Sequence, residues 1–96
     1  MTFTKRLHAG IAAGEITCTV RVWHAPRVKL GGRYAVADGA VEVTRIREIG
    51  WDDITPDLAR RSGFAGVVDL LKIARHGSGQ RVFLIDFAYR PDAAAA

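Results

Sequence analysis

The sequence predicts a single α+β domain: a small, partly open β-barrel flanked by helices. Three observations favour this fold class. The 96 residues suit one domain. Helix-like and strand-like segments follow in the order helix, strand, two strands, two helices, strand. No internal repeat or linker interrupts them. We expect the domain to span residues 1–91, and we expect the patternless, alanine-rich residues 92–96 to form a disordered tail.

The N-terminal segment is the first expected helix. Three apolar residues recur every four positions and share one helical face: Phe3, Leu7 and Ile11. Thr2 or Thr4 would cap the start of this helix, and Gly14 suits the position just after its end. Residues 17–23 then alternate between polar and apolar and are rich in β-branched side chains, which predicts a strand.

Alternation gives this strand two different faces, because successive side chains point to opposite sides of a sheet. One face is apolar and is expected in the core: Cys18, Val20 and Val22. The other face collects two hydroxyls, a guanidinium and an indole: Thr17, Thr19, Arg21 and Trp23. This polar face is the first candidate for a binding surface.

A loop and two strands are expected next. Residues 24–33 contain a proline and a glycine pair, which predict a loop. The next two strands should turn at the favoured hairpin dipeptide Asp38-Gly39. In the second strand the apolar phase breaks near Thr44-Arg45, which predicts a β-bulge.

Two helices and a last strand complete the pattern. Thr55 is the expected cap of the first of these helices, with Pro56 at its first position and Gly63 at its end. The second helical stretch, residues 64–77, is apolar at several positions and carries basic residues in its last turn: Arg75 and His76. Residues 81–90 form a strand that is apolar on both faces over its first half, so it should lie centrally in the sheet.

Composition favours a basic protein without a membrane segment. The net charge is +4, and eleven of the fourteen basic residues are arginines, which suit phosphates and stack on bases. Cys18 is the single cysteine, so a disulfide framework and a cysteine-rich metal site are excluded. The three histidines are too scattered for a metal-ligand pattern. Without a signal peptide or a long apolar run, we expect a cytoplasmic protein with no membrane partner, metal or cofactor.

The element order, with Gly14, Thr19 and Arg21 at their spacings, resembles the ASCH domain of the PUA-like superfamily. The family signature is a glycine, a lysine two residues on, a glutamate or threonine three later and an arginine two after that. The resemblance covers about the whole chain and includes the pair Gly63-Phe64. It implies a PUA-like barrel with a cleft near the signature, and RNA or a nucleoside-type ligand as partner.

Some small members of this family are acetylcytidine amidohydrolases, in which the lysine, the threonine and a later glutamate act in catalysis. Here the lysine position is Ile16, no glutamate follows Glu48, and a loose alignment puts Ser62 near the glutamate position. Isoleucine can neither ionise nor donate a hydrogen bond from its side chain, so we assign no catalytic residue and favour a binding domain. The alternatives are a nucleic-acid-directed hydrolase (amidohydrolase or ribonuclease) with a rearranged site, using His24 or an aspartate such as Asp53 or Asp57, and a protein-interaction module.

The expected ligand contacts come from the polar strand face and the following loop. Thr19 and Arg21 would line the cleft, and Trp23 would stack on a base. Three basic residues around the glycine pair would meet phosphate: Arg27, Lys29 and Arg33. For each there is a plainer interpretation. Thr19 and Arg21 could simply lie on a solvent-exposed sheet face, and Trp23 could pack in the core. The three basic residues could belong to a solvated charged loop.

Overall fold

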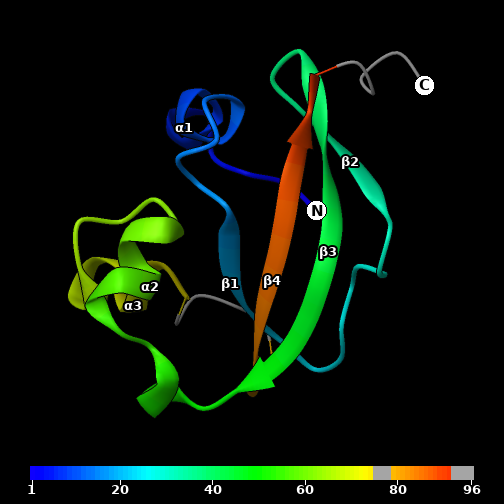
Figure 1. Ribbon diagram of the computed structural model, residues 1–96. Coiled ribbons are helices and arrows are strands. Elements are labelled where there is room, and N and C mark those ends of the chain that lie inside the picture. Colours follow the sequence, from blue (N-terminus) through cyan, green and yellow to red (C-terminus); the bar gives the residue numbers. More distant parts are fainter. Residues whose placement is uncertain (75–78, 92–96) are drawn as a thin grey trace.

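The computed structural model describes residues 1–74 and 79–91. It shows an α+β fold in which a curled, four-stranded antiparallel sheet forms a half-barrel with helices beside it (Figure 1). The element order confirms the order predicted from the sequence. The basic last turn of the second helical stretch, Arg75 and His76, and the expected tail, residues 92–96, lie outside the described residues.

The sheet has the strand order β1-β4-β3-β2. Its strands are β1 (Cys18–Trp23), β2 (Arg33–Val36), β3 (Gly39–Ile49) and β4 (Arg81–Arg90). The last strand in the sequence therefore lies between β1 and β3, which confirms its predicted central position. Val82, Leu84 and their neighbours in β4 are at most 3% exposed on both faces. β1 forms one edge of the described sheet and β2 the other.

The predicted β-bulge is confirmed in β3. Val43 pairs with Phe87 of β4, and Arg45 pairs with the adjacent Asp86, so Thr44 is the extra residue. A bulge bends the strand that carries it and increases its twist. In Figure 1, β3 curves along its length, and this curvature contributes to the curl of the sheet.

The hairpin between β2 and β3 turns one residue earlier than predicted. The turn residues are Ala37 and Asp38, and Ala37 has a φ of 53°. Gly39 already belongs to β3 and pairs with Val36. The glycine is needed for a close approach instead, because a Cβ there would lie 2.6 Å from the main-chain oxygen of Arg90.

The first helical region is shorter than expected and begins with a 3₁₀ turn, η1 (Lys5–Leu7), before α1 (His8–Ala12). Gly14 follows the helix with a φ of 78°, as a glycine just past a helix end should. The expected threonine cap is wrong. Thr4 occupies the N-cap position, but its side chain makes no capping hydrogen bond, since the Leu7 N–H is satisfied by the Thr4 carbonyl at 3.0 Å.

The second helical region follows the prediction closely. Thr55 caps α2 (Pro56–Arg61) by accepting a hydrogen bond from the Leu58 N–H at 3.1 Å. Gly63, with a φ of 94°, ends this region before α3 (Val67–Ala74). A short 3₁₀ turn that the sequence did not predict, η2 (Trp51–Asp53), connects β3 to these helices.

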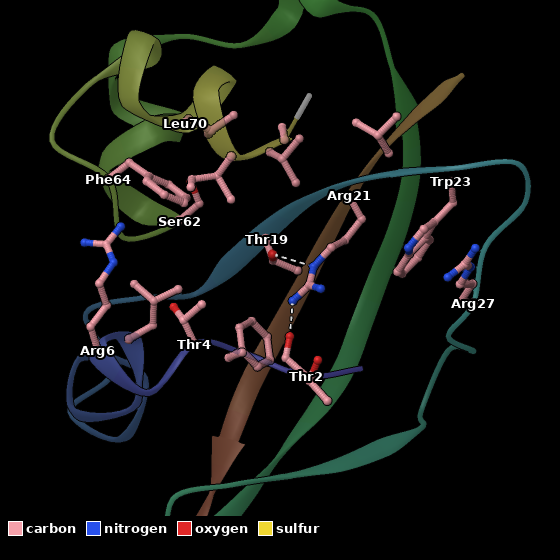
Figure 2. A pocket seen from close by; sticks show the side chains of 16 residues that line it. Thr2, Thr4, Arg6, Thr19, Arg21, Trp23, Arg27, Ser62, Phe64 and Leu70 are labelled. Carbon is pink, nitrogen blue, oxygen red and sulfur yellow. Dashed lines mark hydrogen bonds between the residues drawn. The ribbon is translucent and has the colours of Figure 1, made fainter. Parts of the chain in front are cut away.

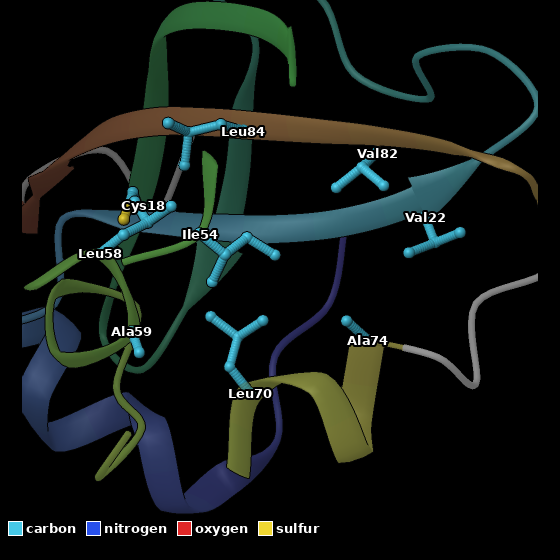
Figure 3. Close-up of a cluster of buried hydrophobic side chains, with 9 residues drawn as sticks. All are labelled: Cys18, Val22, Ile54, Leu58, Ala59, Leu70, Ala74, Val82 and Leu84. Atoms are coloured by element: carbon cyan, nitrogen blue, oxygen red, sulfur yellow. The ribbon is translucent and has the colours of Figure 1, made fainter. Parts of the chain in front are cut away.

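Buried side chains lie on both faces of the sheet. The largest cluster joins β1 and β4 to α2 and α3 (Figure 3): Cys18, Val22, Ile54, Leu58, Ala59, Leu70, Ala74, Val82 and Leu84. Alternate residues of the same strands face the other side, where Trp23 packs with Phe83 and Ile85. A third cluster holds α1 against β2, β3 and β4. The central strand thus contributes to every cluster.

The different burial of two isoleucines predicts different effects of their removal on stability. Ile85 is fully buried in β4, whereas Ile73 on α3 is 56% exposed. We expect Ile85→Ala to lower the free energy of unfolding by about 2–5 kcal/mol, because it leaves a cavity in the packed core. Ile73→Ala, the matched control, should stay within about 0.5 kcal/mol of the wild type. Urea denaturation measures both, and equal losses would contradict the placement of the core.

Candidate functional site

A cavity of about 430 Å³ lies along the free edge of β1. Its walls come from three parts of the chain: the N-terminal segment from Thr2 to Leu7, residues 19–23 of β1, and the region from Ser62 to Ala74 around α3. The loop residue Arg27 closes one side (Figure 2). A cavity of this size is large enough for a small ligand.

Arg21 is the half-buried cation of this cavity, and its guanidinium is held from several sides. Its Nε donates to Thr19 Oγ1 at 3.0 Å, and one terminal nitrogen donates to the Thr2 carbonyl at 2.6 Å. The guanidinium also stacks over the Phe3 ring, 5.0 Å from the ring centroid. Figure 2 shows the two hydrogen bonds, and together with the ring contact they fix the guanidinium at the cavity wall.

The charge of Arg21 is not paired with a carboxylate of the described residues. Across residues 1–74 and 79–91, no carboxylate lies within ion-pair distance of this guanidinium. Burial lowers the pKa of Arg21 from its ordinary value, yet a guanidinium remains protonated in proteins. Two further arginines line the same cavity, Arg6 and Arg27, and its described lining contains no acidic residue. Such a cavity favours an anion, which the remaining N–H groups of Arg21 can bind.

Aromatic and aliphatic side chains form the rest of the wall. Arg6 stacks over Phe64, with its guanidinium carbon 5.4 Å from the ring centroid. Trp23 lines the cavity but is only 7% exposed, and its ring packs at 6.1 Å from that of Phe83. Most of the Trp23 ring therefore belongs to the core, which leaves Phe64 as a second aromatic wall at the other end of the cavity (Figure 2).

The structure brings together four of the six residues proposed from the sequence: Thr19, Arg21, Trp23 and Arg27. Lys29 and Arg33 lie outside the cavity lining. Arg33 pairs with Glu42 at 3.0 Å on β2, at the far edge of the sheet. The amides of the glycine pair are also used within the fold: Gly31 N–H donates to Val43, and Gly32 N–H donates to Lys29.

Sequence reasoning missed the residues that cover β1 from the N-terminal segment. Thr2, Phe3 and Arg6 line the cavity, but helical periodicity assigned this segment only to packing. The sequence shows Arg6 beside the apolar helical face of Phe3 and Leu7. This pattern does not indicate which strand the segment covers. Ser62 also lines the cavity, but it is 3% exposed and its hydroxyl donates to the carbonyls of Leu58 and Ala59 in α2.

Ile16 lies outside this cavity. It is 9% exposed and packs in the cluster around α1. A Cβ on Gly10 or Gly63 would lie 2.7 or 2.8 Å from its terminal carbon, so the isoleucine fills a slot between two glycines. Ile16 is therefore a packing residue in this chain.

The side chains considered for acid–base chemistry lie outside the cavity. His24 is exposed, and its carbonyl accepts from Arg81 at 3.1 Å. Asp57 pairs with Arg60 and Arg61, and Asp53 accepts from the Gly50 N–H. Among the described lining residues there is no aspartate, glutamate, histidine, lysine or cysteine.

Two further properties of the described chain bear on the site. No three histidine, cysteine, aspartate or glutamate side chains in residues 1–74 and 79–91 are grouped so that they could hold a metal ion. Nor does that part of the chain contain a helix long and apolar enough to cross a membrane. Comparisons with models of protein families, with curated proteins and with solved structures found no match.

Cys18 generates a prediction about pH. Burial raises the pKa of its thiol to about 11, against about 8.5 in an unfolded chain. The folded state therefore favours the neutral thiol, and this contribution to stability is complete below pH 8.5 and is lost as the pH rises towards 11. We expect the free energy of unfolding to fall by up to about 1.4 kcal/mol per pH unit in that range from this group.

The measurement is urea denaturation between pH 8 and pH 11 of the wild type and of Cys18→Ala. The variant keeps every other titrating group, so the difference in slope isolates the thiol. Parallel slopes for the two proteins would show that Cys18 titrates normally in the folded state.

Proposed function

We propose that this chain binds RNA or a nucleoside-type ligand in the cavity beside β1, with Arg21 holding an anionic group of the ligand. One observation carries this proposal. A half-buried guanidinium, oriented by Thr19 and Thr2, faces a ligand-sized cavity and has no carboxylate partner within the described residues. In nucleic acids the anion is phosphate, and the planar guanidinium of an arginine can donate two hydrogen bonds to it at once.

Several further features support a nucleic-acid ligand. The chain carries a net charge of +4, and three arginines line the cavity. Phe64 and the exposed part of Trp23 offer surfaces on which a base could stack. The resemblance to ASCH domains, with their PUA-like barrel, fits the curled sheet and belongs to this proposal. We further propose a cytoplasmic location, which suits a chain whose single cysteine is free.

The lining favours binding over hydrolysis. An amide or phosphodiester hydrolase without a metal needs a positioned acid or base, and such a group must lie within hydrogen-bond reach of the reacting atoms. The described cavity lining supplies hydroxyls, guanidinium groups and apolar side chains instead. Of the two rival functions, the hydrolase and the protein-interaction module, neither has a specific observation in its favour.

Removal of the Arg21 guanidinium tests the proposal directly. We expect Arg21→Ala to weaken the binding of single-stranded RNA by about 1–3 kcal/mol, since it removes charge-assisted hydrogen bonds to phosphate. Arg33→Ala is the matched control, because it removes the same charge from a position outside the cavity. Affinity of the wild type should also fall with salt, with a log–log slope of about −0.7 per phosphate contact.

Fluorescence anisotropy with a labelled oligonucleotide measures both effects. Equal losses of RNA affinity in Arg21→Ala and Arg33→Ala would mean that RNA responds only to the overall charge of the protein. A salt-independent affinity, or no binding at micromolar RNA and low salt, would refute the proposal and favour protein docking.

A second prediction concerns acetylcytidine. We expect no hydrolysis by the wild type, because Ile16 is a packing residue and Ser62 bonds within its own helix. Ile16→Lys, alone or with Ser62→Glu, should also be inactive and should be less stable, since each substitution places an ionisable group at a buried position. Product formation is followed by chromatography, with circular dichroism as the control for folding. Clear turnover by the wild type would place the active site elsewhere and refute the binding-only function.

A further inference from the structure

The edge strand β1 presents main-chain groups, as well as side chains, to the cavity. β1 pairs with β4 on one side only. The Phe87 N–H donates to the Thr17 carbonyl at 3.0 Å, so within β1 the odd-numbered residues direct their main-chain groups towards β4. The N–H of Thr17, just before the strand, turns away from β4. The even-numbered residues direct theirs away. Val22 agrees with this phase, because its carbonyl accepts from Gly79, which lies outside β4, at 3.4 Å.

Among residues 1–74 and 79–91, main-chain hydrogen bonds cover this free edge at both ends, and none covers it at Val20. At one end the Thr17 N–H donates to the Arg61 carbonyl at 3.0 Å, and Cys18 is fully buried. At the other end the Val22 carbonyl is bonded to Gly79. Val20 lies between them and belongs to the cavity lining. Its N–H and C=O, one donor beside one acceptor, therefore face the cavity.

The width of this opening selects the kind of partner. A peptide that adds as a strand needs several consecutive free groups on the edge, and here the Val22 carbonyl is already bonded and Cys18 is buried. The N–H and C=O of one extended residue bond a partner that offers an adjacent acceptor and donor, as in the doubly bonded pairs of antiparallel sheets. A planar ring lactam, the edge that uracil and guanine present, offers this arrangement in one small unit.

We propose that the Val20 main chain pairs with the lactam edge of a nucleobase while Arg21 holds the phosphate of the same nucleotide. This inference rests on the proposed function and adds to it the part of the ligand that confers selectivity. Val20 and Arg21 are adjacent in the chain, and both line the cavity. The site would then distinguish bases by hydrogen bonds to the main chain. Of all substitutions at Val20, only proline removes one of these main-chain groups, the N–H.

The test uses three probes: uridine 5′-monophosphate, its N3-methyl derivative and ribose 5-phosphate. Methylation at N3 removes the lactam donor and leaves the Val20 carbonyl unpaired, so we expect binding weaker by about tenfold or more. Ribose 5-phosphate should bind at the same reduced level. Titrations by ¹H–¹⁵N NMR measure these affinities, and the Val20 amide signal should shift with uridine monophosphate but not with the methylated probe.

Val20→Pro tests the protein side, because proline removes only an N–H that faces away from β4. It should weaken uridine monophosphate binding to the level of ribose 5-phosphate, and it should do so more than Val20→Ala, which changes the side chain but keeps the main-chain N–H. Should the proline variant fail to fold, the probe series still decides. Equal affinity for all three probes would overturn base recognition and leave the phosphate site of Arg21 intact. Binding of none of them, with no binding of RNA, would overturn the proposed function itself.

Discussion

The burial of β4 on both faces is the constraint on which the rest of this fold depends. Val82 and Leu84 pack under α2 and α3, whereas Phe83 and Ile85 pack on the opposite face. A small domain can cover both faces of a strand only if the sheet curls and separate segments close each side. The bulge at Thr44 supplies curvature to β3, and the N-terminal segment and α1 supply the second cover.

This arrangement also explains where the cavity lies. With β4 in the centre, β1 becomes an edge strand, and the two covers meet along that edge from opposite faces. α3 approaches from the side of Val22, and the N-terminal segment approaches from the side of Arg21. Neither cover pairs with the main chain of Val20 within the described residues. The cavity is thus the gap between two covering layers, and its floor is the outer edge of β1.

Local rules predicted the features that depend on local chemistry. The cap at Thr55, the break at Thr44 and the two-faced apolar strand β4 each have a signature within a few residues. The turn was misplaced because Gly39 serves a contact with Arg90, fifty-one residues later in the chain, which no local pattern records.

In the candidate site, too, local patterns predict some residues, and only the tertiary fold brings the others together. Alternation placed Thr19 and Arg21 on one face, as the structure has them. Sequence proximity to a glycine pair suggested Lys29 and Arg33, but both lie outside the cavity lining, and Arg33 is on the far edge strand β2. Arg6 comes to the cavity only because its segment folds over β1, which depends on tertiary packing.

Arg21 is costly for a domain that needs only a stable strand. Its half-buried charge has no carboxylate partner in the described part of the chain, and the hydrogen bonds to Thr19 and Thr2 replace its lost hydration only in part. A threonine or valine in its place would form the strand at lower cost. The same contacts hold the guanidinium fork in one orientation, so an arriving anion meets a donor whose side-chain entropy is already lost. Residues that reduce stability while they orient a charged group towards a cavity are concentrated at functional sites. Ligand binding there offsets the free energy that is lost when the charge is buried.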